Sequence, residues 1–273
     1  MLTNHKLLLD NTCPMCTIYG NCFIRLAYVD KTTLSSYQHI EEEYSEHIDM
    51  ELAQSKIALY DTESRSSLYG IDAILHIIEI KHKYIAQILR LPMIYWILEI
   101  LYSFISYNRK IIVRPSLALN GRNCNPPLIH GYRWAYLVIT ALLTGLILKL
   151  YYSPIFMGLG WSINPWTEYI ICFAQVIFQY ISFRYFFKET PLHYLGHMST
   201  VSMIGGTLLL PMLLLNSMIT LPIFLLLGYF FVVVGIMLTE HIIRSTRLGL
   251  GWTMTLSWIT FRTLILIILI VSL

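Results

Sequence analysis

Two cysteines near the N-terminus have the type and spacing needed for thiol–disulfide chemistry. Cys13 and Cys16 flank Pro14 and Met15, and a short apolar run that ends at Asp10 precedes them. At the start of a helix this spacing puts the two sulfurs one turn apart, close enough to bond. The first sulfur would lie over unpaired N–H groups and the positive end of the helix dipole, which favours the thiolate. The motif therefore predicts a redox dithiol.

Other interpretations of the motif are half of a zinc site or two buried structural cysteines. A zinc ribbon needs a second cysteine pair at similar spacing, and Cys22, Cys124 and Cys172 do not supply one. Cys22 could be a third redox partner, but filling the core is the favoured interpretation for a single helical cysteine. Cys124 is predicted to be an ordinary loop thiol.

The elements around the dithiol alternate between strands and helices. Strands are predicted at 6–10, 32–37 and 56–60, helices at 14–29, 40–54, 71–80, 84–91 and 93–107, and a turn at 66–70. Pro14 suits the first turn of its helix. The acidic residues of 40–54 are predicted to form a solvated helix face. This β-α-β-α-β-α order predicts a thioredoxin-like α/β domain.

The same segment resembles the DCC family, predicted thiol-disulfide oxidoreductases named for one Asp and two Cys. The residues that match are Asp10, Cys13, Cys16, Gly70-Ile71-Asp72-Ala73, Leu91-Pro92, Tyr102 and Arg109. The resemblance covers about residues 6–112. Asn11 departs from the pattern, which usually has Gly after the Asp, but Asn tolerates a left-handed backbone. The family implies a thioredoxin-like fold and redox activity.

In an active dithiol, Cys13 is the exposed nucleophile and Cys16 the buried resolving thiol, and no cofactor is required. Asp10 could accept a proton from Cys16, and a role as a helix cap or turn residue fits it equally well. Thioredoxins carry a cis-proline just before their third strand, whereas residues 44–60 contain no proline. Ordinary thioredoxin-type substrate binding is therefore not expected.

Composition divides the chain in two. It is 56% hydrophobic with a mean hydropathy of +0.60, and most of its charged residues lie in 1–133. We expect an α/β domain at 1–112, a basic linker at 113–133 and a membrane domain at 134–273. The net charge of +3 does not indicate nucleic acid as a partner. The run Leu7–Leu9 is too short for a signal peptide, so the first domain is expected in the cytoplasm.

The membrane domain is predicted to be an all-α polytopic bundle of about five transmembrane helices. Apolar segments lie at 134–152, 166–187, 195–216, 219–239 and 253–273, and Arg262 interrupts the last one. Loops with Arg184, Lys188, Arg244 and Arg247 alternate with loops that lack Lys and Arg. The positive-inside rule then predicts an inner or plasma membrane protein with a cytoplasmic N-terminal domain.

Polar side chains inside these spans mark a second candidate site. Glu168, Cys172, Gln175, Gln179 and Ser182 form one helical stripe in the second span. His193, His197, Glu240 and His241 are predicted near the cytoplasmic face. They could hold a quinone or a metal or form a proton site, but hydrogen bonding at helix ends is the favoured interpretation, and no metal site is assigned.

The sequence thus predicts a membrane-anchored thiol-disulfide oxidoreductase that works at the cytoplasmic membrane face. Its expected partners are the lipid bilayer and a protein thiol or disulfide. One alternative is a non-catalytic thioredoxin-like adaptor that serves as the membrane subunit of a larger complex. A further alternative is a small transporter lined by the polar stripe of the second span.

Overall fold

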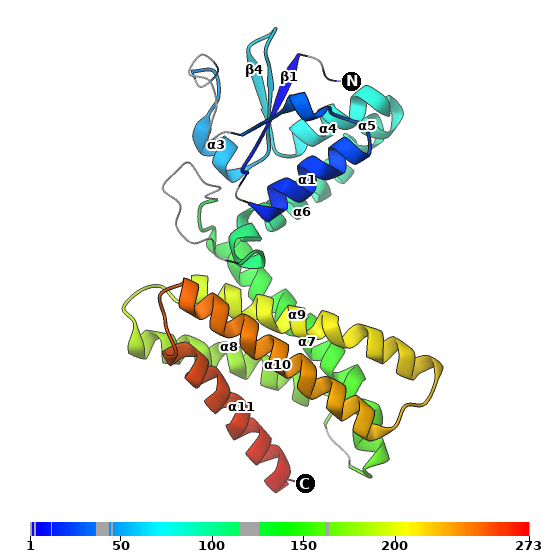
Figure 1. Ribbon diagram of the computed structural model, residues 1–273, viewed down its shortest axis with the longest axis vertical. Coiled ribbons are helices and arrows are strands. Elements are labelled where there is room, and N and C mark those ends of the chain that lie inside the picture. Colours follow the sequence, from blue (N-terminus) through cyan, green and yellow to red (C-terminus); the bar gives the residue numbers. More distant parts are fainter. Residues whose placement is uncertain are drawn as a thin grey trace. The chain divides into compact units, whose positions relative to one another are not determined.

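The computed structural model describes residues 2, 4–11, 13–36, 44, 46–114, 126–161 and 164–272. The chain divides into two compact units, Met1–Tyr132 and Arg133–Leu273 (Figure 1). The predicted thiol Cys124 and most of the predicted linker lie outside the described residues, as do the first acidic positions of the predicted helix 40–54. Whether 113–133 is a separate linker stays a prediction.

The N-terminal unit contains a four-stranded sheet with helices around it. In chain order its elements are β1 (His5–Leu9), α1 (Pro14–Arg25), the 3₁₀ turn η1 (Lys31–Thr33), β2 (Leu34–Ser36), α3 (Met50–Ser55), β3 (Ala58–Asp61), β4 (Ser66–Tyr69) and α4 (Ile71–Lys81). The strand order is β2-β1-β3-β4. β1 and β2 run parallel, and the other two pairs are antiparallel. The predicted α/β domain is thus present.

Apolar residues of the central strands form the core of this unit. Leu7 and Leu9 of β1 and Leu59 of β3 are buried with Ala73 and Ile77 of α4. These side chains alternate along each strand, so one face of the sheet packs against the helices. The dithiol helix α1 packs on the same cluster through Cys16.

Two sequence-based expectations for this unit were wrong. The segment predicted as a turn at 66–70 is strand β4, which pairs with β3 from Ala58↔Tyr69 to Asp61↔Ser66. The serines of β4 have little intrinsic strand preference, and pairing with β3 overrides it. Cys22 is exposed rather than part of the core. It lies on a different face of α1 from Cys16 and Gly20, which are the buried positions of that helix.

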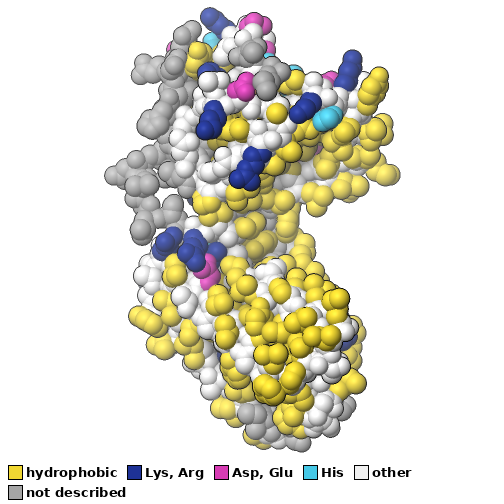
Figure 2. Space-filling model, turned by 45° about the vertical axis from the view of Figure 1, so that its right-hand side comes forward, with side chains coloured by type: hydrophobic (Ala, Val, Ile, Leu, Met, Phe, Trp, Pro, Cys, Tyr) yellow, Lys and Arg dark blue, Asp and Glu magenta, His cyan; other side chains and the backbone are white. Residues whose placement is uncertain are grey.

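Two further helices complete the N-terminal unit. Helix α5 spans Lys83–Leu89 and α6 spans Pro92–Ile112, with Pro92 at the start of α6. The pair is apolar enough to cross a membrane if taken as one span, but it bends by 84° at the break. Figure 2 shows hydrophobic side chains gathered along one side of this unit.

The described residues of the second unit form five helices. They are α7 (His130–Gly158), α8 (Thr167–Phe186), α9 (Leu192–Met218), α10 (Ile223–Arg247) and α11 (Thr253–Ser272). Each of the five predicted spans corresponds to one of them. By length and composition, α7, α9 and α10 could each cross a membrane. If the bent pair α5–α6 is counted as one span, the described chain has four candidate spans. The presence of apolar helices long enough to span a membrane is confirmed, and the number five stays a prediction.

Gly70 provides a test of the fold at the junction of β4 and α4. Its φ of 64° and ψ of −129° are accessible to glycine but strained for other residues. A Cβ there would lie 3.2 Å from the Tyr102 ring and 3.3 Å from Lys56. We expect Gly70→Ala to lower the free energy of unfolding by about 1–3 kcal/mol. Denaturation of the full chain in detergent micelles measures this.

Arg65→Gly is the matched control, because Arg65 in the β3–β4 hairpin also has a positive φ, 54°. Glycine relieves backbone strain at that position, so this variant should be as stable as the parent within about 1 kcal/mol. Equal losses in the two variants would contradict the conformation assigned to Gly70.

Candidate functional site

The dithiol lies where β1 leads into α1. Cys13 is the N-cap residue of α1 and Pro14 begins the helix, as the sequence predicts. The Cys13 N–H donates to the Asp10 carbonyl at 3.2 Å, and the Thr17 N–H donates to the Cys13 carbonyl at 3.1 Å. The backbone of Cys13 is thereby held at the helix start, where the N-terminal partial positive charge acts.

The two cysteines differ in exposure. Cys13 is partly exposed and Cys16 is buried. A partner can therefore reach Cys13 directly, whereas Cys16 is shielded by the fold. This difference suits the roles of nucleophile and resolving thiol that the sequence suggests for them. Asp10 is buried beside them, and its predicted role as proton acceptor stays a prediction.

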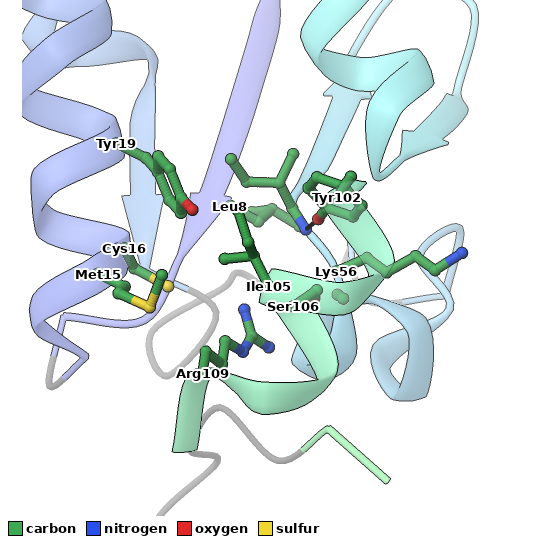
Figure 3. A pocket seen from close by; sticks show the side chains of 11 residues that line it. Leu8, Met15, Cys16, Tyr19, Lys56, Tyr102, Ile105, Ser106 and Arg109 are labelled. Atoms are coloured by element: carbon green, nitrogen blue, oxygen red, sulfur yellow. Dashed lines mark hydrogen bonds between the residues drawn. The ribbon is translucent and has the colours of Figure 1, made fainter. Parts of the chain in front are cut away.

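Cys16 lines a small pocket that α1 shares with α6 (Figure 3). Tyr19 from α1 and Tyr102 and Arg109 from α6 contribute polar groups to it. The cavity volume is about 20 Å³, enough for one or two water molecules. The other lining residues are Leu8, Met15, Ala53, Lys56, Ile57, Ile105 and Ser106. Most of the wall is apolar.

Three side chains of α6 hold that helix to the segment that enters β3. The Tyr102 hydroxyl accepts a hydrogen bond from the Ile57 N–H at 2.8 Å. Ser106 donates to the Ser55 carbonyl at 2.6 Å, and Arg109 donates to the Gln54 carbonyl. The three positions are four and three residues apart and so share one helix face. We call them the polar seam.

The polar seam lies at the start of β3, the region where the sequence lacks a proline. Ile57 comes directly before β3, and its N–H is already bonded to Tyr102. No cis peptide bond occurs among the described residues. The sequence-based expectation that substrate binding differs from that of ordinary thioredoxins stays a prediction.

Charges near the dithiol act on Tyr19. Burial raises the pKa of the Tyr19 hydroxyl above its ordinary value, the field of Cys16 raises it further, and Arg109 opposes these effects. Tyr19 is thus protonated at neutral pH and can donate a hydrogen bond. Arg109 is buried in the same pocket as Cys16. A fixed guanidinium in this position favours a thiolate.

Sequence reasoning did not assign functional roles to Tyr19, Tyr102 or Arg109. Tyr102 and Arg109 were noted only as parts of the family pattern. Their spacing, with Ser106 between them, was an available signal, since it marks a polar stripe on a helix that is otherwise apolar. Tyr19 gave no comparable signal, because one tyrosine on a helix is common in any core.

The N-terminal unit is a small α/β domain with two cysteines at the start of its first helix. Residues 7–114 match the model of the family described as DCC1-like thiol-disulfide oxidoreductase. This confirms the resemblance to the DCC family over the N-terminal unit, and the match ends before α7. No curated protein and no solved structure matches the chain.

The predicted histidine site of the second unit is divided between two networks. In the first, Arg244 donates from Nε to Glu240 at 2.7 Å and from Nη1 to Nδ1 of His197 at 3.0 Å. His193 is exposed, and it does not share the burial of His197. Among the described residues, no group of three or more His, Cys, Asp or Glu side chains is placed to hold a metal ion.

The second network is centred on His241. The Tyr194 hydroxyl donates to Gln179 at 2.7 Å and lies 3.2 Å from Nε2 of His241. Because Tyr194 has only one proton, His241 must donate from Nε2, and Nδ1 is left to accept from Thr255 at 3.1 Å. A quinone or metal at His241 would have to replace these bonds. A cofactor at the histidines stays a prediction.

The polar stripe of α8 borders a separate cavity of about 10 Å³ inside the second unit. Gln175, Thr144, Cys172 and Arg262 are among its lining residues. Within the described part of the chain, both amide atoms of Gln175, the Thr144 hydroxyl and Nε of Arg262 make no hydrogen bond. The cavity has room for about one water molecule, which such groups would bind.

Removing the Tyr102 hydroxyl should weaken the polar seam. Tyr102→Phe keeps the ring but leaves the buried Ile57 N–H without an acceptor, at an expected cost of about 1–3 kcal/mol in the free energy of unfolding. Tyr84→Phe is the control, because Tyr84 is exposed on α5, and it should change stability by less than about 0.5 kcal/mol. Denaturation of the full chain in micelles compares them, and equal stabilities would contradict the role of the seam.

The charge of Arg109 should control the reactivity of the dithiol. We expect Arg109→Gln to slow alkylation of the reduced dithiol at pH 7 by about threefold to tenfold, because less thiolate forms without the guanidinium. Arg109→Lys keeps the charge and should retain most of the rate. A pH profile of iodoacetamide labelling measures both variants. If the lysine variant reacted as slowly as the glutamine variant, charge would not be the cause.

Proposed function

We propose that the protein is a membrane-anchored thiol-disulfide oxidoreductase whose reactive pair is Cys13 and Cys16. The observation that carries this proposal is the position of the pair: Cys13 is partly exposed at the N-cap of α1, and Cys16 is buried beside Arg109. The match of residues 7–114 to an oxidoreductase family supports it. The sheet order β2-β1-β3-β4, with the dithiol after β1, supports a thioredoxin-like fold.

The reaction is a two-electron exchange. The Cys13 thiolate attacks one sulfur of a partner disulfide, a mixed disulfide forms, and the other partner sulfur leaves as a thiolate that takes up a proton. Cys16 then gives up its proton, attacks the Cys13 sulfur and releases the second partner thiol. The pair ends oxidised to a disulfide and the partner reduced to two thiols. The same steps in reverse oxidise a dithiol partner.

The residues around the pair support these steps. Asp10 is the proposed acceptor of the Cys16 proton, because it is buried next to the start of α1. Arg109 stabilises thiolate charge in the pocket, and Tyr19 supplies a neutral hydroxyl beside it. No cofactor takes part in this exchange.

The second unit serves as the membrane anchor. We propose that α8 and α11 cross the bilayer together with α7, α9 and α10, which gives five spans. Arg184, Lys188, Arg244 and Arg247 then lie on the same side as the N-terminal unit. The positive-inside rule makes that side the cytoplasm of an inner or plasma membrane. In a reducing cytoplasm the pair is mostly reduced and acts as a reductant or a sensor.

Two alternatives remain in other classes. A non-catalytic adaptor within a membrane complex would use the N-terminal unit for binding alone, and the absence of proline from residues 44–60 favours it. A small transporter is favoured by the polar cavity at Gln175, Thr144 and Arg262. A quinone or metal at His193, His197, His241 and Glu240 would extend the redox proposal into the bundle.

The redox proposal predicts a reversible couple between Cys13 and Cys16. The purified full chain, equilibrated in glutathione buffers of set potential, should show a transition in the thiol modification of these two residues and none at Cys22. A Cys16→Ser variant should retain a partner as a mixed disulfide on Cys13 in cells, and Cys22→Ser, the control, should retain none. If no transition occurred at biological potentials and a Cys13→Ser, Cys16→Ser double variant kept its cellular function, the adaptor would be the better explanation.

A further inference from the structure

Helix α6 has its polar and apolar faces reversed relative to a helix on a water-soluble domain. The side chains that it buries are mainly polar, and they include Ser103, Ser106, Asn108 and Arg109. Three of its exposed side chains are Met93, Trp96 and Leu101, with exposed fractions of 77%, 62% and 53%. In water, packing would bury the apolar face and expose the polar one.

Six large apolar residues that α6 exposes form one stripe, spaced three or four residues apart. They are Met93, Trp96, Ile97, Ile100, Leu101 and Ile105, and Glu99 is the exposed acidic residue of the helix. Helix α5 extends the stripe with Tyr84, Ile85 and Ile88, which are also exposed. We call this surface the apolar face of α5–α6; it belongs to the hydrophobic side of the N-terminal unit in Figure 2. A soluble protein would not leave so large an apolar stripe in water.

The helix pair is poorly suited to cross the bilayer. Tyr102, Ser106 and Arg109 hydrogen-bond to backbone groups next to a strand of the sheet. Crossing would draw this seam and the attached sheet into hydrocarbon, where edge N–H and C=O groups find no partners. The 84° bend between α5 and α6 is also unlike a straight span. Helix α6 has one apolar face, and its other face is bound to a folded domain. This pattern is typical of helices that lie flat in the membrane–water interface.

We propose that the apolar face of α5–α6 is a membrane-binding surface that lies in the lipid headgroup region. Trp96 and Tyr84 are the aromatic types that prefer this region. Lys83 flanks the face and would meet anionic headgroups, while Arg90 is in an ion pair with Glu79 at 2.9 Å. The chain is also tethered next to a bilayer, because α6 ends at Ile112 and the candidate span α7 begins at His130. These features favour lipid over a second protein.

The face is connected to the dithiol site. Ile105 belongs to the apolar face and also lines the pocket of Cys16. Binding of the face to lipid would therefore hold the dithiol pocket at the bilayer surface, where it would meet partners that are themselves at the membrane. The proposal does not depend on the redox activity, since it rests on the exposed residues alone.

Spin labels on the full chain in liposomes test this proposal. Met93→Cys, Ile97→Cys and Leu101→Cys are labelled one at a time in a chain whose native cysteines are replaced by serine, with Ser64→Cys in the β3–β4 hairpin as the control. Oxygen should relax the labels on the face several-fold more than a water-soluble nickel chelate does. The three labels should lie at a uniform depth of about 5–10 Å in the bilayer. The label at residue 64 should be relaxed more by the nickel chelate.

Each other outcome would overturn the proposal. Face labels that respond like residue 64 would place the face in water. If the depth of the labels increased steadily along α6 to the bilayer centre, α5 and α6 together would form a transmembrane span. Labels shielded from both reagents would mean that protein covers the face, and spin–spin broadening would then identify a second copy.

A second measurement avoids replacing the cysteines. Tryptophan fluorescence of the otherwise native chain is quenched by lipids brominated near the headgroup, and Trp96→Phe should remove part of that quenching. Trp258→Phe is the control, because Trp258 is buried in the second unit, and it should leave the quenching by shallow bromolipids unchanged. Quenching that is the same with and without Trp96 would contradict the proposal.

Discussion

The three hydrogen bonds of the polar seam are the interaction on which the arrangement of the N-terminal unit depends. Their acceptors include the Gln54 and Ser55 carbonyls at the C-terminal end of α3. Carbonyls at this end of a helix have no partner within the helix. The seam thus satisfies groups that would otherwise be unpaired, and each buried group left unpaired would cost about 1–3 kcal/mol. Because α6 is fixed in this way, Arg109 is fixed in the pocket of Cys16.

The same constraint explains why apolar residues of α6 face outward. A helix whose polar side chains are taken up by backbone partners has its remaining face apolar, and that face is stable only next to an apolar medium. The helical unit follows the same rule. Two of its buried charged residues, Arg244 and Glu240, pair with each other, while large apolar residues such as Phe224 and Phe231 are exposed. The proposed contact with lipid thus accounts for the exposed apolar residues of both units.

The sequence predicts those features of the fold that depend on neighbouring residues in the chain. The order of strands and helices, Cys13 and Pro14 at the start of α1, and the apolar helices follow from periodicity, capping and hydropathy. β4 was missed because its serines form a strand only through pairing with β3. The spacing of the seam residues marks a polar stripe on α6, but their partners could not be predicted, because these are backbone groups about fifty residues earlier in the chain. The polar networks of the second unit join four helices, so spacing within one helix could not separate His197 from His241.

The size of the dithiol pocket determines how a partner can react. A space of about 20 Å³ admits water but no part of a polypeptide. In the proposed exchange, a partner disulfide therefore presents a sulfur to Cys13 from outside, and Cys16 completes the reaction from within the fold. Because the Cys13 backbone is held at the helix start, the proposed mixed disulfide would form within one turn of Cys16. The mainly apolar surroundings strengthen the interaction between Arg109 and a thiolate, because one or two water molecules screen it less than bulk water would. The second step of the proposed exchange, the attack of Cys16 on the mixed disulfide, thus takes place inside the protein. The first step depends on which partners can reach Cys13 on the surface of the N-terminal unit.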